Sequence, residues 1–175
     1  MSPISEFRHT VASTGLSVRL KIRRLRSSDY RTVMRIEEFI LDEYRQYLKR
    51  TRERDEVPSG IQPAYFNYYV RTKSSFAALV DGEVVGYILG QPVSFTDGEK
   101  KILWLDYVAV LPKFRRRGIG SSLLSKVANW ATQHGCSMLY TSLNPNNTPS
   151  RLLLGRRGFA VRNWMKAVKE LRGRR

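Results

Sequence analysis

The chain of 175 residues is strongly basic, with 31 Lys and Arg against 15 Asp and Glu and a formal net charge of +16. Its 42% hydrophobic residues suffice for one core, so we expect a single domain of residues 17–171 between a flexible arm, residues 1–16, and a basic tail, residues 172–175. One cysteine excludes an internal disulfide framework, the two histidines lack metal-ligand spacing, and no apolar run is long enough to span a bilayer. We therefore predict a cytoplasmic protein without a metal site.

The first part of the domain has the pattern of one strand followed by helices. Residues 17–24 alternate apolar and polar side chains, which is the period of a half-buried strand. The Ser-Ser-Asp run at 27–29 offers N-cap chemistry for a helix. Apolar residues then recur at three- and four-residue spacing: Met34, Ile36, Phe39, Ile40 and Tyr44. The aromatic run at 65–69 predicts a second, shorter helix.

The middle of the chain has the pattern of three antiparallel strands. Residues 76–80 and 84–95 flank an Asp-Gly turn, which predicts a hairpin. A second Asp-Gly turn at 97–98 leads into residues 102–111, with the sequence ILWLDYVAVL. Because this run is nearly all apolar, we predict a central strand that is buried on both faces.

The last part adds alternating helices and strands. A helix is predicted for residues 118–134, closed by Gly135, and a strand for residues 138–143. A short helix at 150–156 and a last strand pair within 159–171 follow. The order predicts an α/β fold with a mixed central sheet, antiparallel N-terminal strands and helices on both faces.

The junction between the apolar strand and the next helix, RRRGIGSS at 115–122, has the chemistry of an anion site. Free backbone N–H groups there meet the positive end of a helix dipole. Gly118 and Gly120 let a phosphate approach the backbone, three arginines add charge, and Ser121 and Ser122 add hydroxyl donors.

Two common phosphate motifs do not fit this loop. The dinucleotide fingerprint needs a third glycine where Leu123 stands, and no carboxylate-ended strand follows at the expected distance. The nucleoside-triphosphate loop needs a Gly-Lys-Ser/Thr ending, which Gly120-Ser121-Ser122 does not provide. An ordinary strand-to-helix turn on a basic surface is a further alternative.

The segment VAVLPKFRRRGIGSSLL, residues 108–124, closely resembles the R/Q-x-x-G-x-G/A loop of the GNAT acetyltransferases, including the strand and proline before it. NTPSRLLLGRRGF, residues 147–159, resembles that family's segment of an asparagine, a short helix and a Gly-Phe pair. With the hairpin DGEVVGYILG, residues 81–90, the resemblance covers about residues 17–170.

The resemblance implies acetyl-CoA as cosubstrate and assigns its contacts. Arg115 would head the motif. The backbone amides of the loop would hold the CoA pyrophosphate, namely those of Arg116, Arg117, Gly118, Ile119, Gly120 and Ser121. The pantetheine amides would pair with the backbone of Val108, Ala109 and Val110 as an added strand would. Asn147 would contact the pantetheine arm, and the amide of Val108 or Val110 would donate to the oxyanion.

At neutral pH an amine acceptor is protonated to an ammonium, so it must lose a proton before it attacks the thioester. The family commonly places the base on the strand before the loop, where Asp106 is the one carboxylate. A structural role, with Asp106 bonded to a neighbouring strand or paired with a lysine, is the alternative.

Many family members protonate the departing thiolate with a tyrosine four residues before the Gly-Phe glycine, but here Leu154 stands there. Tyr140 is the predicted substitute, and Ser142 is a second candidate. Buried structural hydroxyls, or release assisted by water, are the alternatives.

Seven of the 15 acidic residues lie within 37–56: Glu37, Glu38, Asp42, Glu43, Glu53, Asp55 and Glu56. This local reversal of charge favours a cationic acceptor such as a protein N-terminus, a lysine or a polyamine. Pairing with basic residues on the helix surface explains the run equally well. The overall charge leaves open a nucleic-acid-associated module or weak contact with a polyanion, and the missing tyrosine leaves open a non-catalytic acyl-CoA-binding protein.

Overall fold

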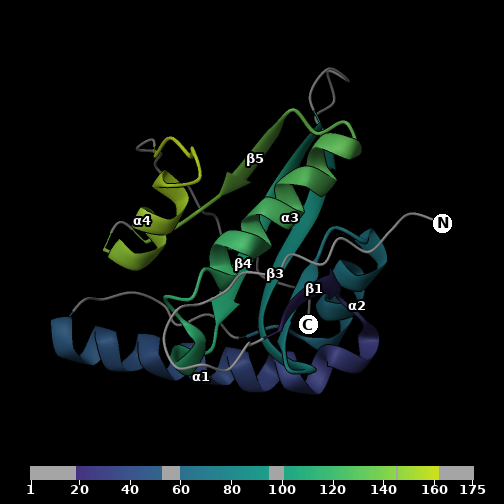
Figure 1. Cartoon of the computed structure of the whole chain (residues 1–175). Helices are drawn as coiled ribbons and strands as arrows, with labels where there is room; N and C mark the ends of the chain where they lie inside the picture. The colour runs from purple at the N-terminus through teal and green to yellow at the C-terminus, as the bar shows by residue number, and fades with distance from the viewer. Residues whose placement is uncertain (1–18, 53–59, 95–100, 145, 162–175) are drawn as a thin grey trace, which may run out of the picture. The chain divides into compact units, whose positions relative to one another are not determined.

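A five-stranded sheet forms the framework of the larger of two compact units in the computed structural model, which describes residues 19–52, 60–94, 101–144 and 146–161. The units divide between Ser142 and Leu143. The strands lie in the order β1-β2-β3-β4-β5 and span Leu20–Arg24, Phe76–Val80, Glu83–Ser94, Lys101–Val110 and Met138–Thr141 (Figure 1). The first four are antiparallel neighbours, and β5 runs parallel to β4. The predicted mixed sheet is confirmed.

The hairpin of β2 and β3 turns at Asp81 and Gly82, as the sequence predicts. Both residues have positive φ, 49° and 88°. Two central residues of this kind give a turn whose twist matches the twist of the flanking strands.

Helices cover both faces of the sheet, as predicted. Helices α1, Tyr30–Thr51, and α2, Pro63–Thr72, pack on β3, where Tyr87 and Leu89 join a core with Val33, Ile36 and Phe66. Successive strand residues point to opposite faces, so the intervening Ile88, also buried, belongs to the other face. There α3, Ile119–Gln133, contacts all five strands and lies over β3 and β4 in Figure 1.

The Ser-Ser-Asp run does not cap the helix as predicted. It forms a 3₁₀ turn, Ser27–Asp29, before α1. The Asp29 carboxylate accepts from the backbone N–H of Arg26 at 2.8 Å and from the Arg23 guanidinium at 2.6 and 2.7 Å, and it makes no side-chain cap to α1. This carboxylate therefore ties β1 to the entry of α1.

The β4 strand is less buried than its apolar sequence predicts. Ile102, Leu103 and Leu105 are buried, but Val108 is 37% exposed and Asp106 and Tyr107 are half-buried. The reason lies in the pairing, because β5 pairs only from Ile102↔Met138 to Leu105↔Thr141. Beyond Leu105, β4 has no strand partner on that side within the described residues. The prediction of burial on both faces is wrong for this half of the strand.

The smaller unit contains α4, Thr148–Gly155, where a short helix was predicted. Asn147 Oδ1 caps it by accepting from the backbone N–H of Ser150 at 3.1 Å. The chain leaves α4 through Gly158, whose φ is 79°. Residues 159–161 do not form the predicted last strand pair, and the rest of that prediction, residues 162–171, lies outside the described residues.

Across the ranges that the structure describes, none of the helices combines the length and apolar character that crossing a membrane requires.

Candidate active site

The loop between β4 and α3 presents backbone donors at the start of a helix. The chain leaves β4 through a 3₁₀ turn, Pro112–Phe114, and passes through Arg116 and Gly118, which have φ of 62° and 77°. The Ser122 N–H bonds to the Gly118 carbonyl at 2.9 Å. The three amides before it, at 119–121, have no carbonyl one turn earlier within the helix to accept from them. Such amides, at the positive end of the dipole, bind anions.

Gly118 gives this loop both its backbone conformation and open space. Its φ of 77° lies in the left-handed region, which side chains other than glycine adopt at a cost. A Cβ at this position would meet no heavy atom within 4 Å. A phosphate can therefore approach the backbone from this side.

Arg115 supports the loop through two contacts with the rest of the larger unit. Its Nε donates to the Val110 carbonyl at 2.9 Å, and its guanidinium forms an ion pair with Glu43 of α1, with Nη1 3.1 Å from Oε1. Both partners are partly exposed, so the pair adds little to stability. Its effect is geometric, because it fixes the C-terminal end of β4 and the start of the loop against α1.

Asp106 lies where β4 departs from regular pairing. On one side, Leu89 pairs with Tyr107 and Gly90 with Leu105, so Asp106 is the extra residue of a β-bulge. On the other side, it follows the last residue that β5 pairs. A bulge redirects a side chain, and here it places a carboxylate at the point where β4 and β5 separate.

The Asp106 carboxylate receives hydrogen bonds from both neighbouring elements. Its Oδ2 accepts from the Tyr69 hydroxyl of α2 at 2.8 Å and from Gln91 Nε2 of β3 at 2.9 Å. Burial raises the pKa of Asp106, and hydrogen bonds from Tyr69, Gln91 and Trp104 offset part of that rise. Among the described residues no lysine or arginine forms a salt bridge with it. The carboxylate is therefore oriented by neutral donors, and its raised pKa suits a proton acceptor.

Tyr140 of β5 lies beside Trp104, its partner in the β4–β5 ladder. The two rings stack, with centroids 6.3 Å apart and planes 10° apart. The Tyr140 hydroxyl lies 3.8 Å from Met138 Sδ, a weak acceptor. Tyr140 thus stands one residue before the end of the β4–β5 pairing.

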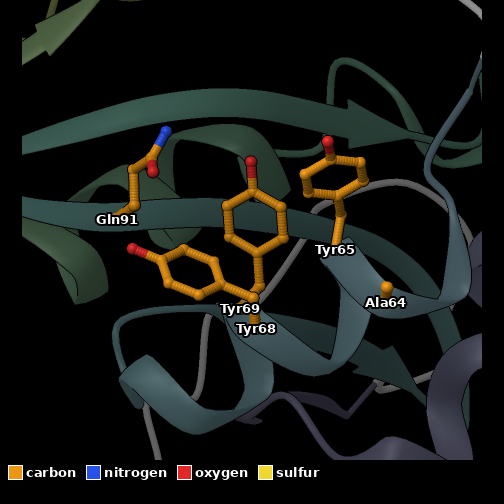
Figure 2. Close-up of a pocket in the computed structure, with 5 residues that line it drawn as sticks. All are labelled: Ala64, Tyr65, Tyr68, Tyr69 and Gln91. Atoms are coloured by element: carbon orange, nitrogen blue, oxygen red, sulfur yellow. The ribbon is translucent and has the colours of Figure 1, made fainter. Parts of the chain in front are cut away.

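A cleft of about 420 Å³ opens beside Asp106. It is lined by Ala64, Tyr65, Tyr68 and Tyr69 of α2 and by Gln91 of β3. Figure 2 shows the three tyrosines rising from one side of α2, with Tyr69 below Gln91 and Tyr65 farthest from it. Two of the lining side chains, Tyr69 and Gln91, are the donors to Asp106, so the cleft and the carboxylate belong to one site.

The described members of the acidic run have different surroundings. Glu37 is only 4% exposed and accepts a hydrogen bond from the buried Tyr87 hydroxyl. Glu43 is engaged by Arg115, and Glu53, Asp55 and Glu56 lie outside the described residues. Glu38 and Asp42 are exposed on α1, where Gln46 Nε2 donates to Asp42 Oδ2 at 2.9 Å.

Sequence reasoning missed Gln91, which stands in no pattern that distinguishes it from its neighbours. It placed Tyr69 only in the aromatic run that predicts a helix, and Glu43 only in the acidic run. In the described part of the chain no group of His, Cys, Asp and Glu could hold a metal ion.

A model of the acetyltransferase (GNAT) family matches residues 34–159, which include the loop, Asp106 and the cleft. The chain belongs to this family. The resemblance that the loop and the Asn147 segment carry is thereby confirmed, and so is the GNAT fold.

Two curated GNAT relatives are informative. The aminoglycoside N(6')-acetyltransferase type 1 of Salmonella typhimurium is 32% identical over 90 residues, which are 49% of this chain and 61% of the relative. The L-2,4-diaminobutyric acid acetyltransferase of Nocardia farcinica is 34% identical over 79 residues, 44% of this chain and 38% of the relative. The matches thus span less than two thirds of either relative's length.

Solved structures share the fold. A structure of the aminoglycoside N-acetyltransferase AAC(6')-Iy in complex with CoA superposes with a TM-score of 0.63 at 20% identity, covering 90% of this chain and 99% of the other. At this identity the likeness shows the arrangement of the elements and leaves the chemistry to the residues of this chain.

Proposed function

We propose that this GNAT protein transfers an acetyl group from acetyl-CoA to a primary amine. The observation that carries the proposal is the separation of β5 from β4 at Asp106. β4 thus has the Asp106 carboxylate at its bulge and, after it, an edge that β5 does not pair. The loop at the end of β4 can accept an anion at the start of α3. A thioester arm laid along that edge would bring its acetyl group to the carboxylate.

The residues present fit acetyl-CoA. The amides at 116–121 and the open position at Gly118 suit a pyrophosphate, and Arg116 and Arg117 add positive charge. The backbone of Val108, Ala109 and Val110 would take the pantetheine amides, because β5 does not pair with these residues. Arg115 would act by holding the loop, since its guanidinium is bound to Glu43. Asn147 remains the proposed contact to the pantetheine arm, and its Oδ1 also caps α4.

Asp106 would accept the proton of the amine, directly or through one water. An alkylammonium has a pKa of about 10.4, and its nitrogen cannot attack a carbonyl carbon until it loses a proton. Burial raises the pKa of Asp106 toward the range in which a carboxylate is an effective base, while the donors Tyr69 and Gln91 fix its orientation. The amide of Val108 or Val110 would donate to the oxyanion.

Tyr140 would protonate the departing thiolate. Its ring lies on Trp104, two residues before Asp106 on β4, which places it at the end of the sheet where β5 departs. Within the described ranges its hydroxyl hydrogen-bonds to Met138 Sδ alone, a weak acceptor, so it can turn toward a leaving group.

The acceptors named for the curated relatives, aminoglycosides and L-2,4-diaminobutyric acid, are amines, which supports an amine acceptor here. The finer predictions of a protein N-terminus, a lysine or a polyamine rest on the acidic run. That support is weak, because Glu37 is buried and Glu43 is paired with Arg115.

The test is a mass-spectrometric screen in which the full chain and acetyl-CoA are incubated with peptides, polyamines, aminoglycosides and small amines. The proposal predicts products heavier by one acetyl group, formed only when both protein and acetyl-CoA are present. If acetyl-CoA raises the melting temperature but no amine is acetylated, the chain is a non-catalytic acyl-CoA-binding protein and the proposal is wrong.

A further inference from the structure

The cleft beside Asp106 is aromatic and carries little charge of its own. Its lining comprises three tyrosines, one glutamine and one alanine, none of which is charged at neutral pH. Tyr65, Tyr68 and Tyr69 occupy helical positions i, i+3 and i+4, so they share one face of α2. Among the described residues, the carboxylate that hydrogen-bonds to this lining is Asp106, behind Tyr69 and Gln91.

Two of the tyrosines expose their rings to solvent instead of filling the core. Tyr65 is 65% exposed and Tyr68 is 38% exposed, whereas Tyr69 is buried and directs its hydroxyl to Asp106. Tyr68 is held edge-on to Tyr69, with ring centroids 5.7 Å apart and planes 73° apart. The cleft therefore has aromatic walls with exposed ring surface, and two of its lining side chains, Tyr69 and Gln91, bind the Asp106 carboxylate.

From this arrangement we infer the class of amine that the site takes, an inference that rests on the proposed function. The acceptor is a small primary amine with a single positive charge and an aromatic ring a few bonds away. Its ammonium pairs with Asp106, next to Tyr69 and Gln91, and its ring lies against Tyr65 and Tyr68. Aromatic pairs of this kind contribute beyond simple burial of area, and stacking adds geometric selectivity.

Charge argues against an acceptor with several ammonium groups. One carboxylate compensates one charge, and further ammonium groups would stand among neutral phenols on a chain of net charge +16. The two exposed carboxylates of the described part of α1, Glu38 and Asp42, are not among the residues that line the cleft. This inference separates the chain from its relatives that are named for aminoglycosides.

The experiment compares initial rates of acetylation of four probes by the full chain: 2-phenylethylamine, butylamine, 1,4-diaminobutane and an aminoglycoside. We expect kcat/KM for 2-phenylethylamine to exceed that for butylamine by roughly tenfold or more, from contact with two rings, and to exceed that for both polycations. Butylamine has the same amine without the ring, so the ratio of the two isolates the aromatic contact.

Variants then assign the preference to the cleft. Tyr65→Leu combined with Tyr68→Leu should raise KM for 2-phenylethylamine about tenfold and KM for butylamine by much less, and the melting shift by CoA should persist. Tyr65→Phe combined with Tyr68→Phe keeps the rings and should keep the preference. Both residues are at least partly exposed, so the variants should fold.

The outcomes separate this inference from the proposed function. A polycation or butylamine preferred over 2-phenylethylamine, or a Leu double variant that weakens every amine equally, would overturn the aromatic acceptor and leave acetyl transfer standing. Failure to acetylate all four probes would also overturn the aromatic acceptor, whereas failure across the wider screen of peptides, polyamines, aminoglycosides and small amines would overturn acetyl transfer itself.

Discussion

At the scale of single residues, the site depends on how neutral donors hold one carboxylate. Asp106 could be predicted from the sequence, because it is the one carboxylate of an otherwise apolar strand. Its donors could not, since Tyr69 is 37 residues away in the chain and no local period links the two. Of the two structural alternatives, the hydrogen bond to a neighbouring strand is present, from Gln91 of β3, whereas no lysine pairs with Asp106 among the described residues.

This environment predicts the effect of Tyr69→Phe. The hydrogen bond from Tyr69 lowers the pKa of Asp106, so its loss should raise that pKa further. A base must be deprotonated to act, and the acidic limb of the pH profile of kcat/KM should therefore move to higher pH. Tyr68→Phe removes a neighbouring hydroxyl of the same cleft and should leave the limb in place. Identical limbs in wild type and Tyr69→Phe would disconnect Asp106 from the acidic limb.

The buried Glu37 has a consequence for stability that depends on pH. Burial raises its pKa above the ordinary value of 4.5, and the hydrogen bond from Tyr87 offsets part of this. A raised pKa means that the native state binds the proton more tightly than the unfolded state does. The contribution to stability is then complete below about pH 4.5 and is lost as the pH rises through the native pKa.

We therefore predict that Glu37→Gln loses less stability than wild type as the pH rises. The difference in free energy of unfolding between the variant and wild type should increase above about pH 4.5, and urea titration at several pH values measures it. Glu38→Gln, the exposed neighbour on the same helix, is the control and should parallel wild type. Parallel curves for Glu37→Gln as well would contradict the raised pKa.

At the scale of elements, α3 supplies an internal comparison for the loop. Gly118 at its start and Gly135 after its end have φ of 77° and 74°, and a Cβ at either would meet nothing within 4 Å. A substitution therefore imposes similar backbone strain at both positions. Only Gly118 lies at the end of the helix where amides point outward.

We predict that Gly118→Asp abolishes the stabilisation by CoA and that Gly135→Asp does not. A ligand bound only by the native state adds about 2.7 kcal/mol at a hundredfold excess over Kd, which a thermal melt resolves. Asp at 118 puts a side chain and a negative charge where the pyrophosphate would lie. Equal melting shifts in the two variants would show that the ligand binds elsewhere.

The elements also mark the limit of prediction from the sequence. The hairpin, the loop and α3 follow from local signals: an Asp-Gly turn, a glycine pair and a helical apolar period. The break in β4 does not, because it depends on where β5 stops pairing, at Thr141. An apolar run has the same appearance in the sequence whether a neighbouring strand covers all of it or half of it. The predicted burial was therefore wrong for 106–108 and 110, although Ala109 is buried.

At the scale of the whole chain, charge is a poor guide to the site. The net charge of +16 and the acidic run of 37–56 suggested a cationic acceptor drawn by an acidic surface. In the structure, Glu37 is buried and bonded to Tyr87, and Glu43 forms an ion pair with Arg115. The other two described members, Glu38 and Asp42, are exposed. Both partnerships join residues far apart in the chain, 50 residues for the first and 72 for the second. We propose instead that selectivity comes from the aromatic cleft and from Asp106, which Tyr69 and Gln91 of its lining bind.

The measurement that tests the central claim most directly is the pH profile of acetyl transfer by Asp106→Asn. Asparagine keeps the size of the side chain and can still accept a hydrogen bond from Tyr69, but it cannot take a proton. We predict that kcat falls by roughly 10²- to 10⁴-fold, that the acidic limb of the profile disappears, and that CoA binding and the melting temperature stay near wild type. A variant that keeps its rate and its acidic limb, or one that loses stability in place of rate, would show that Asp106 is structural and that the base lies elsewhere.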